Sequence, residues 1–223
     1  MAKVKNLYFL RHGQAFHNVR AEPMRAAGCT FQEFLDQMKE DDSLDSALTE
    51  EGIVQAKEAS DSPMSSQIAE KLELLVSSPL SRCIDTADLI FPRRDPPTRI
   101  ILEEVREING LLLNGKRRKR SMLEKLYPHW DFSGVSNDDD VDWTADELES
   151  DESVRARGLK ALDLLWRRNE TEIAIVAHGG FFRKLFSSSS VVVKDDVARF
   201  SNCECKAMKF VRKDGVYSIE QVS

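Results

Sequence analysis

The sequence predicts an α/β fold, a three-layer sandwich in which helices cover both faces of a mainly parallel central sheet. Three observations favour this class. Short apolar runs of strand type alternate along the chain with segments of helical periodicity. The last residues contain two strand-like runs joined by a turn at Asp214-Gly215, which adds a hairpin. The length of 223 residues suits a single domain, 1–223, with an irregular insertion around 114–147.

The predicted strands are short runs rich in aliphatic, aromatic and β-branched residues. They cover residues 4–10, 74–77, 100–102, 173–177, 205–211 and 216–222. The predicted helices lie between them, at residues 29–39, 50–59, 63–72, 79–90, 154–166 and from 181 onward. This alternation is typical of parallel strands that are connected by helices.

Three of these helices have start signals in the sequence. Thr49 is a predicted N-cap, and Ser62 directly precedes Pro63 at the start of the next helix. Pro79 is predicted at the first position of the helix that carries Arg82, because proline suits that position. The same helix is expected to stop at residues 91–92, where a proline follows.

Residues 114–146 lack regular periodicity, so we expect an irregular segment there. It contains a basic run at 116–120, interpreted as a solvated loop with one or two side chains at the mouth of a pocket. Nine acidic residues lie between Asp138 and Glu152. Because they lack the spacing of a metal-binding loop, a solvated linker is favoured over a magnesium site.

Composition and charge exclude several classes of protein. Hydrophobic residues at 41% and charged residues at 31% exclude collagen-like and wholly disordered chains. The balance of 32 basic against 38 acidic residues gives a net charge of −6, so nucleic acids and membrane surfaces are not expected partners. Four scattered histidines, and four cysteines with one Cys-x-Cys, form no zinc pattern, so we expect no metal and no cofactor. Without a signal-like or membrane-spanning run, the predicted location is cytoplasmic.

Basic side chains follow three of the predicted strands, at the point where each strand ends. The first strand leads into Arg11-His12-Gly13, the strand at 173–177 leads into His178-Gly179, and the strand at 74–77 precedes Arg82. Carboxyl ends of parallel strands meet at the crevice where ligands bind. Any one of these residues alone would be structural in most proteins. Together they predict a pocket for a dianion, and phosphate suits it because guanidinium groups bind its oxygens bidentately.

On these residues the chain resembles the histidine phosphatase superfamily, whose founder is cofactor-dependent phosphoglycerate mutase. Four motifs carry the resemblance, in family order: Leu10-Arg11-His12-Gly13-Gln14 with Asn18, Leu48-Thr49-x-x-Gly52-x-x-Gln55-Ala56, Ser78-Pro79-Leu80-x-Arg82-x-x-x-Thr86-Ala87 and Val176-x-His178-Gly179-Gly180-x-x-Arg183. Three further segments look most like a phosphatase-like group of plants and microbes: Arg-His-Gly-Gln-x-x-His-Asn at 11–18, residues 115–118 and Phe200-x-Asn202-Cys203-Glu204.

The resemblance implies catalysis through a phosphohistidine. His12 would attack phosphorus through a ring nitrogen. Arg11, Arg82 and His178 would surround the phosphoryl oxygens and balance their charge without a metal. Asn18, as a side-chain donor, and Gly179 complete the expected substrate-binding set. His17 is close enough in the sequence to reach the pocket, and the sequence leaves open whether it does so or is structural.

A leaving alkoxide needs a proton, so a carboxylic acid should lie near the bridging oxygen. The candidates are Glu103, Glu104 and Glu107, which follow the predicted strand at 100–102. The family's acid often lies in an Arg-Glu pair at this point, and Arg106-Glu107 is the matching pair. Glu107 is therefore the predicted acid, with Glu104 as the second choice.

The leading interpretation is a phosphatase that acts on a small phosphorylated substrate. A phosphoglycerate mutase is the first alternative. Mutases typically continue Arg-His-Gly with Glu-Ser-x-Trp-Asn and carry an Asn-Glu-Arg acid motif, whereas this chain has Gln14-Ala15-Phe16-His17-Asn18 and Val105-Arg106-Glu107. A phosphate-binding scaffold without catalysis is the second alternative. It ranks lower because both histidines and both arginines are present.

Overall fold

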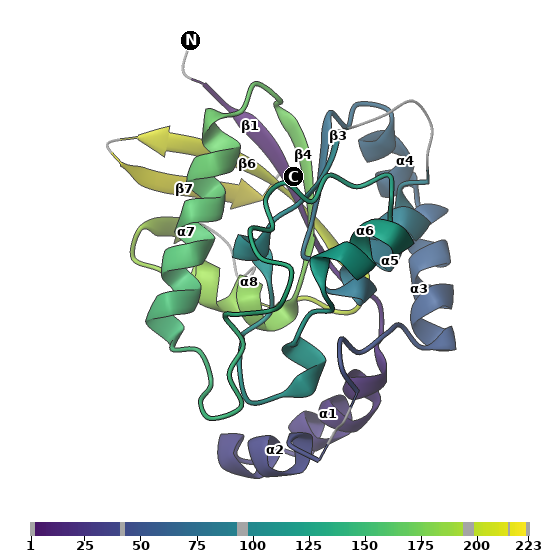
Figure 1. The fold of residues 1–223 in the computed structure, drawn as a ribbon. Helices are drawn as coiled ribbons and strands as arrows, with labels where there is room; N and C mark the ends of the chain where they lie inside the picture. The colour runs from purple at the N-terminus through teal and green to yellow at the C-terminus, as the bar shows by residue number, and fades with distance from the viewer. Residues whose placement is uncertain (1–2, 41–42, 93–97, 194–198, 214, 222–223) are drawn as a thin grey trace.

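The computed structural model describes residues 3–40, 43–92, 98–193, 199–213 and 215–221. Its centre is a seven-stranded sheet in the order β3-β2-β4-β1-β6-β7-β5 (Figure 1). The strands are β1 (Lys5–Arg11), β2 (Leu74–Ser77), β3 (Thr98–Ile101), β4 (Glu172–Ala177), β5 (Val191–Val193), β6 (Cys205–Lys213) and β7 (Val216–Gln221). Within this sheet only β6 opposes the direction of its neighbours, so the predicted mainly parallel sheet is confirmed.

Helices cover both faces of the sheet, as predicted for a three-layer sandwich (Figure 1). The helices are α1 (Phe16–Ala26), α2 (Phe31–Met38), α3 (Glu50–Ser60), α4 (Pro63–Ala69), α5 (Ser81–Ile90), α6 (Arg120–Leu126), α7 (Asp151–Arg167) and α8 (Gly179–Phe186). Strand β1 shows how one strand serves both cores. Leu7 and Phe9 pack with α7 and α8, whereas Tyr8 and Leu10 pack with α3 to α6, because successive side chains of a strand point to opposite faces.

Helices α1 and α2 form a third, smaller packing unit beyond the sheet edge where β1 ends (Figure 1). Phe34, Leu35 and Met38 of α2 are buried there with Ala21 of α1. In α2, Thr30 is the N-cap and forms a capping box with Glu33. The sequence predicts α2 but not α1, because α1 has only weak apolar periodicity and contains Pro23. Strand β5, only three residues long, is also not predicted.

The start of helix α5 differs from the prediction. The helix begins at Ser81 with Leu80 as its N-cap, so Pro79 lies before the helix rather than at its first position. The reason is a distant carboxylate. Buried Asp45 accepts hydrogen bonds from the backbone N–H of Ser81 (2.8 Å) and from its hydroxyl (2.5 Å). A residue outside the helix thus supplies the acceptor that the first N–H of α5 needs.

The insertion is more ordered than predicted, because α6 and a short 3₁₀ turn (Leu113–Gly115) lie within residues 113–126. The basic run is also not a solvated loop throughout. Arg117 is buried; it donates to Glu103 Oε1 (2.5 Å) and to the carbonyls of residues 118 and 137–139. Lys119, in contrast, is exposed and pairs with Asp139.

The acidic stretch is likewise not a solvated linker throughout. The Asp140 side chain is only 1% exposed and forms a two-point ion pair with buried Arg106 (2.6 and 2.8 Å). Arg117 donates to the backbone carbonyls of residues 137–139 and Arg106 to the carboxylate of Asp140, so the buried donors and the acceptors of this irregular stretch are paired. These contacts tie the acidic stretch to the segment that follows β3.

The hairpin of β6 and β7 is confirmed as antiparallel, with Gly215 at a positive φ of 82° in its turn. Two residues of the predicted hairpin, Asp214 and Val222, lie outside the described residues. No helix in the described part of the chain combines the length and apolar character needed to cross a bilayer.

One close approach holds the loop after β1 against α3, and it depends on glycine. A Cβ atom built on Gly52 would lie 2.0 Å from the carbonyl oxygen of Gln14, whereas one on Gly115 meets nothing closer than 3.5 Å. We expect Gly52→Ala to lower the free energy of unfolding by about 2 kcal/mol. Displacing backbone costs more than the gain of about 1 kcal/mol in helix propensity.

Urea denaturation measures this difference, with Gly115→Ala as the control that should leave the midpoint nearly unchanged. An unfolding midpoint for Gly52→Ala that equals or exceeds that of the parent chain would contradict the close approach.

Candidate active site

The two histidine–glycine pairs meet because their strands are neighbours in register. Arg11 at the end of β1 lies opposite Ala177 at the end of β4, and the backbone N–H of His12 donates to Ala177 O (3.1 Å). His12 and His178 therefore leave the sheet side by side. Their ring centroids are 5.0 Å apart in an edge-to-face arrangement, and both side chains are buried.

The guanidinium of Arg82 lies between the two imidazoles. It comes from the first turn of α5, which follows β2, the strand beside β4. Its Nε donates to His12 Nε2 and its Nη2 to His178 Nδ1, both at 3.3 Å, and its Nη1 donates to the carbonyl of Asn114 (2.7 Å). The residue is completely buried. The structure thus brings together three of the predicted site residues.

These contacts define the protonation of His12. Its Nδ1 lies 2.7 Å from Gly13 O, an acceptor, so Nδ1 carries the proton. Its Nε2 receives the N–H of Arg82 and therefore has a free lone pair. Burial and the charges of Arg82 and Arg11 hold the pKa of His12 well below its usual range. The result is a neutral imidazole whose unprotonated nitrogen is Nε2.

His178 has the complementary arrangement. Its Nδ1 accepts from Arg82, so Nε2 carries the proton and donates to Ser78 Oγ (2.8 Å). Burial, followed by the charge of Arg82, lowers the pKa of His178 well below its usual range. Cys83 Sγ lies 3.4 Å from Nε2, and burial raises the pKa of this thiol, which stays protonated.

Arg11 lies beside the same cluster, where its charge contributes to lowering the pKa of His12. Its Nη1 donates to Phe200 O (2.9 Å) and its Nη2 forms an ion pair with Glu22 of α1 (2.7 Å). Its Nε is buried and has no hydrogen-bond partner among the described residues. A Cβ atom on Gly179 would lie 3.4 Å from the Nε and Cδ atoms of Arg11, an ordinary van der Waals contact, so the Arg11 side chain packs beside Gly179.

Helix α1 contributes two polar side chains near His12. Asn18 is buried, and its Oδ1 accepts from the backbone N–H of Ala15 at the helix start (2.9 Å). Only its Nδ2 end is a donor, so a contact with phosphate would use that atom. His17, whose place the sequence left open, has its ring 6.0 Å from the ring of His12.

The Nδ1 atom of His17 is buried without a hydrogen-bond partner among the described residues. Burial and the charges of Arg82, Arg11 and Arg25 lower its pKa well below the usual range. His17 therefore belongs to the same electropositive cluster. In the sequence, only the place of His17 in the first motif pointed to this cluster. Its orientation toward His12 depends on α1, which the sequence did not predict.

The three candidate acids separate in the structure. Glu107 Oε2 accepts from the backbone N–H of Gly180 (3.3 Å), at the start of the helix that follows His178. A Cβ atom on Gly180 would lie 2.3 Å from Glu107 Oε1, so glycine permits this approach. Glu104 instead pairs with Lys160 (2.6 Å), and Glu103 pairs with Arg106 and Arg117.

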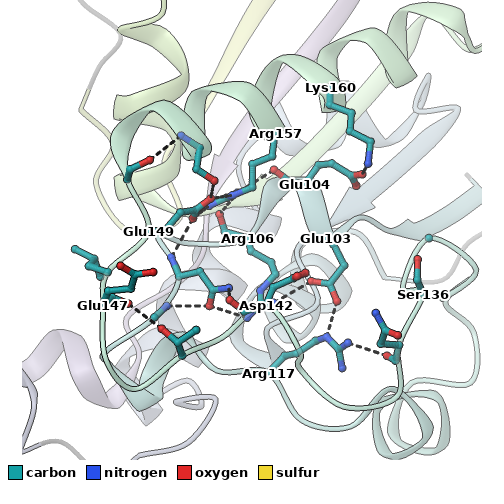
Figure 2. Close-up of a pocket in the computed structure, with 18 residues that line it drawn as sticks. Glu103, Glu104, Arg106, Arg117, Ser136, Asp142, Glu147, Glu149, Arg157 and Lys160 are labelled. Atoms are coloured by element: carbon teal, nitrogen blue, oxygen red, sulfur yellow. Dashed lines mark hydrogen bonds and ion pairs between the residues drawn. The ribbon is translucent and has the colours of Figure 1, made fainter.

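Figure 2 shows where Glu103 and Glu104 lie. They line a second, polar cavity of about 630 Å³ between the insertion and α7, together with Arg117, Arg157 and Lys160. The histidines and Arg82 do not line this cavity. Glu107 is thus the candidate acid that adjoins His178. Within the described residues, no group of three or more His, Cys, Asp and Glu side chains is placed to hold a metal ion.

Solved structures share this fold. The mycobacterial glucosyl-3-phosphoglycerate phosphatase is 21% identical with a TM-score of 0.56, and the alignment covers 97% of each chain. The phosphoserine phosphatase of Entamoeba histolytica, bound to phosphoserine, is 17% identical with a TM-score of 0.51, covering 96% of this chain and 94% of that one. At these identities the likeness supports the fold alone.

Sequence comparison identifies the family. Phosphoglycerate mutase-like protein 1 of Arabidopsis thaliana is 30% identical over 253 residues, which covers 99% of this chain and 86% of that protein. The model of the histidine phosphatase superfamily (branch 1) matches residues 7–222. The match spans all four motifs, so the resemblance that they carry is confirmed. The chain belongs to the histidine phosphatase superfamily.

Proposed function

We propose that this protein is a metal-independent phosphatase that hydrolyses a small phosphomonoester through a phosphohistidine on His12. The observation that carries the proposal is the contact between His12 Nε2 and Arg82. A buried cation donates to a neutral nucleophilic nitrogen, and its hydrogen-bond partners are two imidazole nitrogens and a carbonyl oxygen. A phosphoryl dianion supplies the negative charge that this arrangement lacks.

The first half of the reaction transfers the phosphoryl group to the enzyme. His12 Nε2 attacks phosphorus in line with the leaving oxygen; the N–P bond forms as the P–O ester bond breaks. Arg82 and Arg11 balance the charge on the other phosphoryl oxygens, and His178 contributes once the bound dianion has raised its pKa and it has taken up a proton. The carboxyl group of Glu107 gives its proton to the leaving oxygen, so the product departs as a neutral alcohol.

The second half returns the enzyme to its starting state. A water molecule attacks phosphorus, the N–P bond breaks, and the water proton passes to the carboxylate of Glu107. Inorganic phosphate then leaves. Arg82 and Arg11, with His178 in its protonated form, balance the charge of the phosphoryl group, so no step of the proposed reaction calls for a metal ion. Fold neighbours named as phosphatases of small phosphorylated molecules support this reaction class.

Replacing the nucleophile tests the central step. We expect His12→Ala to lower phosphate release from a panel of phosphorylated metabolites by roughly a thousandfold or more, since loss of a nucleophile removes the covalent route. The parent enzyme should carry acid-labile radiolabelled phosphate, and His12→Ala should not. His129→Ala is the matched control, because the half-buried His129 pairs with Asp88, outside the cluster of His12, His178 and Arg82. Unchanged turnover in His12→Ala, or no label and no turnover in the parent, would contradict the proposal; the second result would favour a scaffold.

Charge on the three imidazoles gives a pH-dependent prediction. The pKa values of His12, His17 and His178 are all lowered, with Arg82 a cause in each case, so all three are neutral near pH 7. A bound dianion opposes the arginine charge and raises these pKa values. Binding should therefore take up protons and weaken as the pH rises.

Sulfate is the suitable probe, because it stays dianionic throughout this range. Calorimetric titration in two buffers of different ionisation enthalpy measures the proton uptake, which should lie between zero and about one proton per site at neutral pH. Proton release on binding, or sulfate affinity that increases with pH, would count against neutral imidazoles in the free site.

The relatives' names favour one second candidate, a phosphoglycerate mutase. Mutase and phosphatase share the phosphohistidine and differ in its acceptor. We expect phosphoglycerates, if they are turned over, to give free phosphate. Conversion of one monophosphoglycerate into the other, stimulated by bisphosphoglycerate, would instead identify a mutase. Coupled assays for both products in the same sample measure the ratio directly.

A further inference from the structure

Arg157 forms hydrogen bonds with the backbone of the segment that carries Glu107. It lies on α7, and its guanidinium uses all five of its N–H groups. Three of them donate to backbone carbonyls of the acid-bearing segment: those of Glu104 (2.9 Å), Arg106 (2.8 Å) and Glu107 (2.9 Å). The other two form a bidentate pair with Glu149, both at 2.9 Å (Figure 2).

Glu149 holds the same segment from its other end. Its Oε2 accepts from the backbone N–H of Asn109 (3.1 Å), and its own N–H donates to Asn109 O (2.8 Å). Burial would raise the pKa of Glu149, but hydrogen bonds and charge from Arg157 lower it overall, so the carboxylate stays ionised. Arg157 and Glu149 together therefore clamp both sides of Glu107.

The clamp matters because residues 106–112 contain no helix or strand that would fix their position. Arg157 also stacks over Phe181 of α8, with 5.2 Å between its Cζ and the ring centroid. Phe181 follows Gly180, whose N–H donates to the Glu107 carboxylate. One side chain thus contacts the backbone that carries Glu107 and the helix that starts after His178.

We propose that Arg157, held by Glu149, is a positioning residue that places the Glu107 carboxyl group at the leaving oxygen of the substrate. The inference rests on the proposed function, because it assigns Glu107 the proton transfer. A general acid must lie within hydrogen-bond reach of the atom it protonates, and a displacement of about 1 Å can reduce the rate on the order of a hundredfold. Loss of the contacts between Arg157 and Glu149 should therefore slow proton transfer by Glu107 and leave His12, Arg82 and His178 in place.

Leaving-group dependence separates these two effects. Dinitrophenyl phosphate has a leaving group that needs no proton, whereas phenyl phosphate depends on the acid. For Arg157→Met we expect kcat/KM to fall about tenfold or more with phenyl phosphate and about twofold or less with dinitrophenyl phosphate. The loss with phenyl phosphate should lie in kcat rather than KM, because the acid acts in the transition state.

Four further variants complete the experiment. Glu107→Gln defines the full acid-dependent loss, and Arg157→Lys keeps the charge without the planar fork, so its loss should be intermediate. Glu149→Gln weakens the clamp with little change of shape and gives a second reading if Arg157→Met folds poorly. Arg167→Met removes an exposed arginine from the same helix and should leave both substrates unchanged.

Two results would overturn the inference, and they are distinguishable. If Glu107→Gln is selective for phenyl phosphate but Arg157→Met and Glu149→Gln slow both substrates equally, the clamp is only structural. If Glu107→Gln shows no selectivity, the assignment of the acid is wrong and the clamp has no catalytic role. The radiolabelled phosphohistidine on His12 is independent of both results.

Discussion

The burial of the Arg82 guanidinium is the constraint on which the rest of the site depends. A cation taken out of water needs an acceptor for each N–H and favours negative charge nearby. Its acceptors here are two imidazole nitrogens and one carbonyl oxygen, all uncharged. Both imidazoles must stay neutral and turn a lone pair toward Arg82, which fixes their tautomers. The carboxylate of Asp45 does not bond Arg82 directly but accepts a hydrogen bond from Ser81, the residue before it. Burial raises the pKa of Asp45 to about 6. The affinity for a dianion that we propose would thus follow from the burial of Arg82 among uncharged acceptors.

The sequence is sufficient to predict that His12 and His178, in the basic half of the site, lie together, because their positions follow from a rule of sheet geometry. Parallel neighbours end at one edge, so residues directly after β1 and β4 meet there, as His12 and His178 do. It is not sufficient to predict that Arg82 is buried. An arginine in the first turn of a helix is ordinarily solvated, and the contact that anchors this helix start comes from Asp45, 36 residues earlier.

The unpredicted parts share a physical cause: each depends on contacts between irregular segments that are far apart in the sequence. His17 lies beside His12 only because of the position of α1, and α1 has little apolar periodicity. The resemblance ranks Glu107 before Glu104, but where their carboxyl groups lie in space depends on contacts such as those of Arg157, some 50 residues later, with the carbonyls of this segment. No local pattern carries that information, since a side chain that donates to backbone carbonyls has no periodic signature.

The basic residues of the site and Glu107 are therefore held in place by different parts of the structure. The basic half stands on β1, β4 and β2, whose paired backbones are buried on both faces and tolerate little displacement. The acid half lies on a segment whose position is set by the Arg157–Glu149 pair and, nearby, by Arg106 with Asp140. In the proposed reaction, capture of the phosphoryl group depends on the sheet. Protonation of the leaving group would depend on side-chain contacts with α7 and the insertion, which are easier to displace than a strand. Protonation of the leaving group, the proposed step that depends on the chemistry of the substrate's alcohol, would thus rely on the contacts that are easiest to change.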